Sequence, residues 1–132
     1  MKIKCFALII FLLSTMDMFS QMVIQSLDSQ FNVTTNKSLV KYIRTINEIN
    51  KNYFAVQINY QTGELMMTGG YLDTLLTIPQ GKFTYFFANG VKESQGYYYN
   101  GQRVDVWERW NFDGTQKPSR YYTELSELLI LK

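Results

Sequence analysis

Histidine is absent from the 132-residue chain, and cysteine occurs once, at Cys5. Without histidine, the chain cannot assemble a Ser-His or Cys-His nucleophile pair, a histidine general base or a histidine-based metal site. The sequence also has no glycine-rich phosphate loop and no acidic calcium-binding loop. It therefore implies no cofactor and no metal, and any catalysis would have to rest on Asp, Glu, Lys or Tyr.

One pair of carboxylates, Asp105 and Glu108 in the segment DVWE, is available for such chemistry. Two acids can divide the acid and base roles when their surroundings separate their pKa values. Acids three positions apart in a strand point to opposite faces, however. We therefore predict that the protein is not an enzyme, and a small carboxylate-based enzyme remains the alternative.

The N-terminus has the pattern of an export signal. Lys2 and Lys4 precede an uncharged apolar run from Cys5 to Leu13, and a polar stretch continues to Ser20. The apolar run is shorter than the roughly 20 residues that cross a bilayer. We predict that residues 1–20 are a signal peptide and that the protein is periplasmic, in the cell envelope or secreted. A buried N-terminal helix is the alternative.

Charge gives little indication of a nucleic-acid or membrane partner. Without residues 1–20 the chain has 11 basic and 10 acidic residues, a net charge of +1. Such a balance produces no strong field to attract nucleic acid or an anionic membrane. We therefore expect no nucleic-acid partner, and no transmembrane span after residue 20.

Dipeptides that favour hairpin turns organise the rest of the sequence. They separate short runs rich in Tyr, Phe, Trp and Val, which are typical of strands. Such dipeptides accept the positive φ angles of two-residue turns, and Thr62-Gly63 is a weaker example. The three strongest pairs are Asn89-Gly90, Asn100-Gly101 and Asp113-Gly114.

These signals predict an all-β fold, an antiparallel meander of consecutive hairpins in a single layer or an elongated sheet. We place the hairpin domain at residues 39–124. Residues 21–38 show little apolar periodicity and are expected to be poorly structured. Residues 125–132 form a tail that we expect to be strand or coil, with a short helix as the alternative, and Pro79 argues against a central strand between residues 73 and 80.

The pattern also repeats along the chain. When the sequence is shifted by 24 residues, Phe83 aligns with Trp107, and the pair Tyr97-Tyr98 aligns with Tyr121-Tyr122. The same shift aligns a second aromatic position and a turn dipeptide. A looser copy lies upstream, at a slightly longer offset. A nearly fixed period of this kind indicates a repeat architecture.

The pattern GKFxYFxxNGxxxxxGxYxxGxRxxxWxxWxxDG, which begins at Gly81, resembles the variant MORN repeats of exported bacterial proteins and of the YwqK-type antitoxin family. The resemblance extends over about residues 53–122. It implies a meander of hairpins with an interaction role, and it supplies no catalytic residues. Asp105 and Arg120 stand where the repeat usually has glycine, so we expect the last copy to be irregular or to act as a cap.

Turn positions predict which residues face one another. They pair Phe83 with Gly96, Gly96 with Asp105, Tyr98 with Arg103, and Trp107 with Arg120. Because side chains alternate across a strand, two faces follow, and we expect the first of them to be the core. It comprises Phe86, Ala88, Val91, Tyr97, Tyr99, Val104, Val106, Trp110, Phe112 and Tyr121.

The opposite face is the candidate binding face, because aromatic residues with arginine are enriched at binding hot spots. The favoured alternative is that these side chains cover one another, with Phe83 filling the gap above Gly96 and the arginine stems lying across rings. The candidate binding residues are Tyr85, Phe87, Tyr98, Arg103, Trp107, Arg109 and Arg120.

Three functions agree with these observations. The leading hypothesis is a non-enzymatic, exported module that binds a protein, a peptide or an envelope component. The second is an antitoxin or immunity-type protein that neutralises a toxin, and the third is the carboxylate enzyme. Exposed edge strands would also allow self-association.

Overall fold

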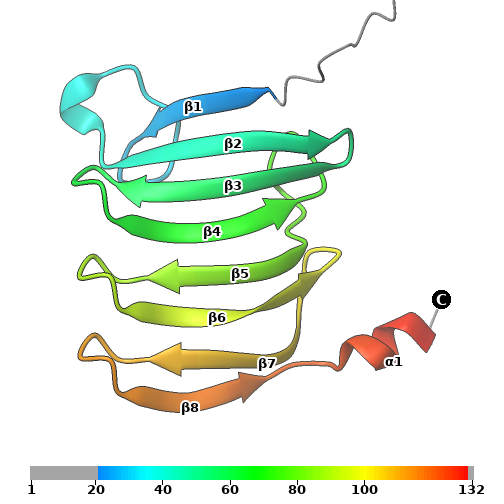
Figure 1. Cartoon of the computed structure of the whole chain (residues 1–132). Helices are drawn as coiled ribbons and strands as arrows, with labels where there is room; N and C mark the ends of the chain where they lie inside the picture. Colours follow the sequence, from blue (N-terminus) through cyan, green and yellow to red (C-terminus); the bar gives the residue numbers. More distant parts are fainter. Residues whose placement is uncertain (1–20, 131–132) are drawn as a thin grey trace, which may run out of the picture.

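The computed structural model describes residues 21–130. The expected signal peptide, residues 1–20, and the last two residues of the expected tail lie outside the described residues. The described chain forms one open antiparallel sheet in which each of eight strands pairs with the next along the sequence (Figure 1). This arrangement confirms the predicted all-β hairpin meander. The strands are β1 (Met22–Leu27), β2 (Tyr42–Asn50), β3 (Tyr53–Tyr60), β4 (Leu65–Tyr71), β5 (Gly81–Phe86), β6 (Lys92–Tyr99), β7 (Gln102–Trp110) and β8 (Gln116–Tyr121).

The first strand lies in the segment that was expected to be poorly structured. Strand β1 pairs with β2 over its whole length, and the 3-10 helix η1 (Lys37–Leu39) follows. Leu27 ends β1 and is fully buried, while Met22 and Ile24 remain largely exposed. Strand β1 forms without an apolar periodicity because backbone pairing with β2 and the burial of Leu27 stabilise it.

Three of the hairpins share one loop geometry. Gly63, Gly90 and Gly114 each have a left-handed φ, between 82° and 108°. In each loop the glycine N–H donates to the carbonyl three residues earlier. This is the three-residue loop in which a type I turn is followed by a left-handed residue. Figure 1 shows these loops, after β3, β5 and β7, along the same side of the sheet.

Two of the predicted two-residue turns are therefore wrong. Asn89 and Asp113 do not occupy left-handed positions. Their side-chain oxygens instead accept the N–H of the residue two positions later, at 3.1 Å and 2.9 Å. This side-chain bond stabilises the longer loop. Asn100 and Gly101 do form a two-residue turn, with φ angles of 49° and 85°.

The core lies on one face of the sheet and depends on glycines. Phe83 and Trp107 are 1% and 2% exposed. A Cβ added at Gly69 would lie 2.3 Å from the Phe83 ring, and one at Gly96 would lie 2.4 Å from the Trp107 ring. Each ring therefore lies flat over a glycine of the preceding strand. Phe83 does not fill the gap above Gly96, as was expected, because Trp107 occupies it.

Rings of tyrosine alternate with these two residues to form an aromatic ladder across β4 to β8. Successive centroids lie 4.8 to 6.4 Å apart, and the rings meet edge to face. Such contacts add about 0.5 to 1.5 kcal/mol per pair to the burial of the rings. The aromatic ladder comprises Tyr71, Phe83, Tyr98, Trp107 and Tyr122.

The predicted core face is the wrong one. Tyr97, Val106 and Tyr121 on that face are 49%, 44% and 79% exposed, although Val104 is buried. Three of the predicted pairings are nevertheless confirmed, namely Phe83 with Gly96, Tyr98 with Arg103, and Trp107 with Arg120. The strands thus pair as expected, but most of the burial lies on the other side of the sheet.

Asp105 interrupts the β6–β7 ladder, so its expected pairing with Gly96 is not among the register pairs. Its φ is 55°, a left-handed value like the 82° of Gly81, which holds the same position in the preceding copy. Asp105 accepts the Tyr122 N–H at 3.0 Å and donates its own N–H to Thr123 at 3.1 Å. An aspartate thus adopts the backbone conformation of the glycine expected here, and the last copy is irregular.

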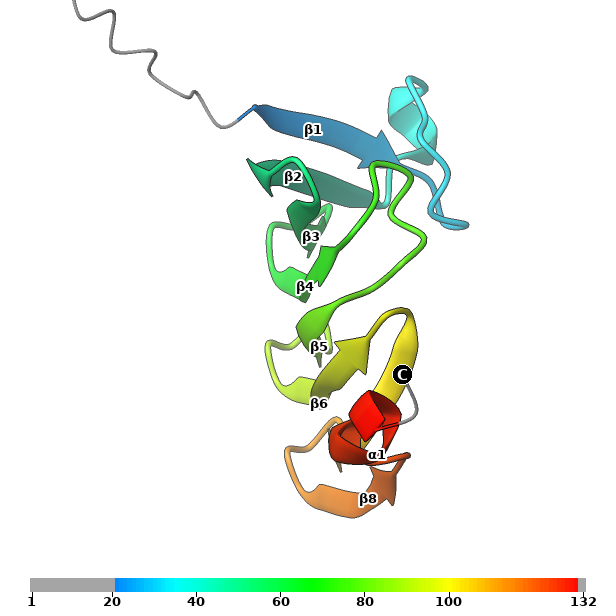
Figure 2. The same ribbon diagram turned by 90° about the vertical axis from the view of Figure 1, so that its right-hand side faces the viewer.

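Two segments accompany the sheet. Residues 72–80 join β4 to β5, and Leu76 of this loop packs against the core. Figure 2 shows this connection standing out from the strands. The C-terminal segment, expected to be strand or coil, contains helix α1 (Leu125–Ile130), whose first N–H donates to the Asp105 carboxylate at 2.9 Å. No helix among residues 21–130 is long and apolar enough to cross a membrane.

Candidate functional site

Six of the seven predicted binding residues lie on the buried face, around the C-terminal end of the sheet. They come from β5, β6, β7 and β8. Phe87 is the exception, because it stands at the start of a hairpin loop and packs edge to face on Phe112 of the neighbouring loop, at 5.5 Å. The candidate site is therefore formed without Phe87.

Trp107 belongs to the interior rather than to the surface. Its indole N–H donates to the Tyr97 carbonyl at 3.2 Å, and its exposure of 2% leaves almost no ring area for a partner. Tyr85 and Tyr98 are half-buried beside it. These rings largely cover one another, so we expect contact with a partner to come mainly from the polar groups around them.

Arg103 is fixed in place above three rings. Its guanidinium carbon lies 4.4 Å from the Trp107 ring centroid and 5.8 Å from those of Tyr98 and Tyr122. Its Nε donates to the Tyr98 hydroxyl and its Nη1 to the Tyr122 hydroxyl, both at 3.1 Å. Two hydrogen bonds leave three of the five guanidinium donors for other partners.

These contacts also affect the ionisable groups. Partial burial opposes the charge on Arg103, but the hydrogen bonds to the two tyrosines outweigh it and raise the pKa of Arg103. The bond from Arg103, with a further contribution from Arg120, lowers the pKa of Tyr122. Burial raises the pKa of Tyr85, and the neighbouring Tyr98 adds to this shift. Arg103 therefore keeps its positive charge throughout the physiological pH range.

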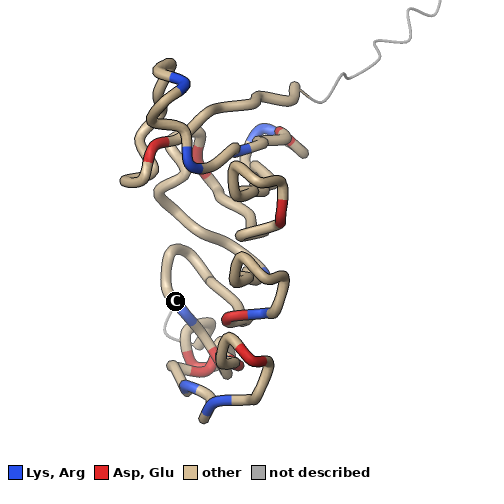
Figure 3. Tube along the Cα trace, turned by 90° about the vertical axis from the view of Figure 1, so that its left-hand side faces the viewer, with Lys and Arg blue, Asp and Glu red and all other residues tan. Residues whose placement is uncertain are grey.

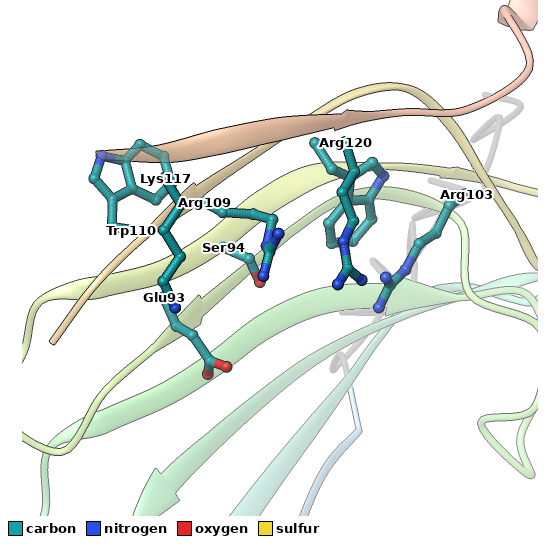
Figure 4. A pocket seen from close by; sticks show the side chains of 8 residues that line it. Glu93, Ser94, Arg103, Arg109, Trp110, Lys117 and Arg120 are labelled. Carbon is teal, nitrogen blue, oxygen red and sulfur yellow. The ribbon is translucent and has the colours of Figure 1, made fainter. Parts of the chain in front are cut away.

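Arg103 forms one end of a cavity of about 280 Å³, which we call the cationic groove. Figure 4 shows the side chains of Arg103, Arg109 and Arg120 extending in the same direction from the sheet. Trp110, Lys117 and Glu93 lie toward the other end (Figure 4). The groove is lined by Glu93, Ser94, Arg103, Trp107, Arg109, Trp110, Lys117 and Arg120.

Four cations and one carboxylate line this groove, which is a concentration of charge in a chain whose overall net charge is +2. Figure 3 shows basic and acidic residues interspersed along the trace. The direction of the side chains therefore creates the cluster. Glu108, for example, alternates with Arg109 along β7 and therefore lies on the other face, where it accepts a hydrogen bond from Gln95 at 3.1 Å.

Half of the lining residues, namely Glu93, Ser94, Trp110 and Lys117, were not among the predicted binding residues. Lys117 lies opposite Arg109 because the β7–β8 register shifts between Trp107 and Arg109. The sequence does show basic residues on both sides of the Asp113-Gly114 turn, and a hairpin brings such residues together. The sequence does not reveal that Lys117 shares a face with Arg109, because this depends on the register shift.

Each carboxylate of the predicted acid pair has its own partner within the fold. Asp105 accepts the first N–H of α1, and Glu108 accepts a hydrogen bond from the Gln95 side chain. The two acids are thus held by different neighbours. Residues 21–130 also contain no group of three or more acidic, histidine or cysteine side chains that could hold a metal ion.

Comparisons with known proteins give no further indication. No protein-family model matches the chain, and neither a curated protein nor a solved structure matches it. The cationic groove is therefore the feature of the molecule that points to a function.

Proposed function

We propose that this chain is a non-enzymatic, exported binding module that captures a protein or an envelope component through the cationic groove. The observation that carries the proposal is the gathering of Arg103, Arg109, Lys117 and Arg120 around one cavity that contains a single carboxylate, Glu93. Charged groups of one sign lining a cleft attract ligands of the opposite sign. The proposed export depends on the signal-peptide pattern of residues 1–20.

The packing beneath the groove supports this role. Arg103 is held by two hydrogen bonds and stacks on Trp107, so little side-chain entropy is lost when a partner binds it. The aromatic ladder gives the groove a rigid base. A hairpin-repeat sheet, such as the MORN-like repeat proposed from the sequence, offers an extended surface of this kind.

Affinity capture from the cells that produce the protein tests the proposal. The full chain is immobilised, and bound molecules are compared with those held by Arg120→Gln and by Lys82→Gln. Lys82 is the matched control, because it is exposed and alternates with the buried Phe83 on β5, which places it on the opposite face. We expect Lys82→Gln to retain the partner and Arg120→Gln to lose it.

Increasing salt should also release the partner, since exposed charges are screened within about 10 Å at 0.1 M salt. Identical capture by the wild type and by folded Arg109→Gln and Arg120→Gln variants would show that the groove is not the binding surface.

A further inference from the structure

Two arginines of the groove stand at repeat positions that the preceding copy fills with uncharged residues, whereas Lys117 corresponds to Glu93 of that copy. Arg120 corresponds to Gly96 of that copy, and Arg109 corresponds to Tyr85. Gly96 must lack a side chain because Trp107 of the next strand covers it. No strand follows β8 in the described part of the sheet, so the space beyond position 120 is open and an arginine fits.

Fold stability alone does not account for the choice of charges. Arg109 and Lys117 are direct cross-strand partners, and like charges in that arrangement are destabilising. An acidic residue at either position would have formed a favourable pair. A cost in stability at a cavity is the pattern expected where a ligand supplies the missing opposite charge.

The shape and number of the donors indicate which anion fits. Guanidinium groups bind oxyanions through two parallel hydrogen bonds. A phosphate ester carries a charge of about −1.5 to −2 and three strong acceptor oxygens, whereas a carboxylate offers two oxygens and one charge. Three guanidinium groups extend in one direction into the groove (Figure 4), which matches the three oxygens of a phosphate ester.

We infer that the cationic groove binds a phosphate group through Arg103, Arg109 and Arg120, and that the partner carries this group. The inference rests on the proposed function and specifies its ligand chemistry. Lys117 adds long-range attraction at the far end. Glu93 lowers the affinity for the anion and directs it toward the arginines.

Titration calorimetry of the full chain with glycerol phosphate tests the inference. We expect measurable binding by the wild type and by Lys82→Gln, and a loss of about tenfold or more in affinity for Arg109→Gln and Arg120→Gln, because each removes charged hydrogen bonds. Glu93→Gln should bind more tightly, by about twofold or more, since it removes a like charge from the cavity. Circular dichroism and thermal unfolding establish that every variant is folded.

The pH profile and the competing anions provide further tests. Affinity should fall below about pH 6, where the phosphate ester loses its second charge, while the arginines stay protonated. Glycerate, which carries a single carboxylate and one negative charge, should bind more weakly than glycerol phosphate. Equal affinity of all variants for glycerol phosphate, or tighter binding of glycerate, would overturn the inference.

Two further measurements locate the source of the phosphate and separate this inference from the proposed function. Arginine-dependent binding to phosphatidylglycerol vesicles, with weak binding of glycerol phosphate, identifies a lipid headgroup, and the reverse result identifies a soluble or glycan-borne ester. A partner captured from cells through Arg120 but not released by glycerol phosphate would contradict the phosphate assignment and leave the proposed function intact.

Discussion

The two faces of the β5–β8 region differ sharply, although both are rich in aromatic residues. On one face Phe83 and Trp107 are almost completely buried. On the other, Tyr97 and Tyr121 are 49% and 79% exposed. The difference lies in the neighbours, because the first face offers glycines over which the rings can lie flat.

This comparison shows how the single sheet of residues 21–130, which has no second layer of strands, forms a core. A ring that stands upright on a lone sheet stays in contact with water, whereas a ring that lies over a glycine loses that contact and touches the backbone. Burial of apolar area is the main stabilising term in folding. The distribution of glycine therefore decides which face is the core, and the number of aromatic residues does not.

The largest loss of stability is expected when a glycine beneath a buried ring is replaced. Gly96→Val places a branched side chain where the Trp107 ring lies 2.4 Å from the Cβ position, so we expect a loss of more than about 4 kcal/mol in the free energy of unfolding. Gln95→Val, on the other face of the same strand, should cost less than about 1 kcal/mol. Denaturant unfolding of both variants measures the difference, and similar losses would contradict the glycine argument.

Removing one ring from each face gives the next largest contrast. Trp107→Ala should cost about 3 to 5 kcal/mol of unfolding free energy, as for other buried aromatic residues. Tyr97→Ala, on the exposed face, should change it by about 0.5 kcal/mol. Thermal or denaturant melts measure both values. A loss for Tyr97→Ala as large as that for Trp107→Ala would mean that both faces are packed in solution.

High pH should weaken the buried face in particular. Burial raises the pKa values of Tyr71 and Tyr85 above the ordinary value of 10.0. The unfolded chain releases these protons first as the pH rises above about 10, so the native state then binds more protons and the free energy of unfolding falls. Below that pH both hydroxyls are protonated in the folded and the unfolded chain, so these two tyrosines should leave the free energy of unfolding unchanged. Tyr85→Phe should flatten the decline measured by unfolding between pH 9 and 11, and an unchanged slope would exclude Tyr85 as a contributor.

The smallest expected change in stability concerns the pair of cations between β7 and β8, at the C-terminal end of the buried face. Lys117→Glu replaces a like-charge pair with an opposite pair across from Arg109, so we expect a gain of about 0.5 kcal/mol in unfolding free energy. Thermal unfolding at low salt measures the gain, which should shrink at about 1 M salt. A loss of stability would show that Lys117 contributes to the fold as it stands.

Much of the strand pairing could be predicted because two errors cancel. The Asn89-Gly90 loop has three residues rather than two, but the β5–β6 register shifts by one between Tyr85 and Phe86. Beyond that bulge the pairing returns to the predicted one, with Phe83 opposite Gly96. Such a bulge regularly accompanies a three-residue loop, so the error is confined to the loop.

The core face could not be predicted from hydrophobic alternation, since both faces carry aromatic residues. Gly96 was recognised as a gap opposite Phe83, but the ring that fills it comes from the next strand, where Trp107 is displaced by the irregularity at Asp105. The predicted arginines do line one cavity. Lys117 joins them through a register shift that no residue pattern revealed.

The arginine at position 120 also distinguishes the last copy from the one before it. A ninth strand that continued the pattern would bring an aromatic ring over β8 at this position, as Trp107 covers Gly96 one copy earlier. A side chain at position 120 would meet that ring, so a further hairpin that packed as β7 packs on β6 would need glycine at this position.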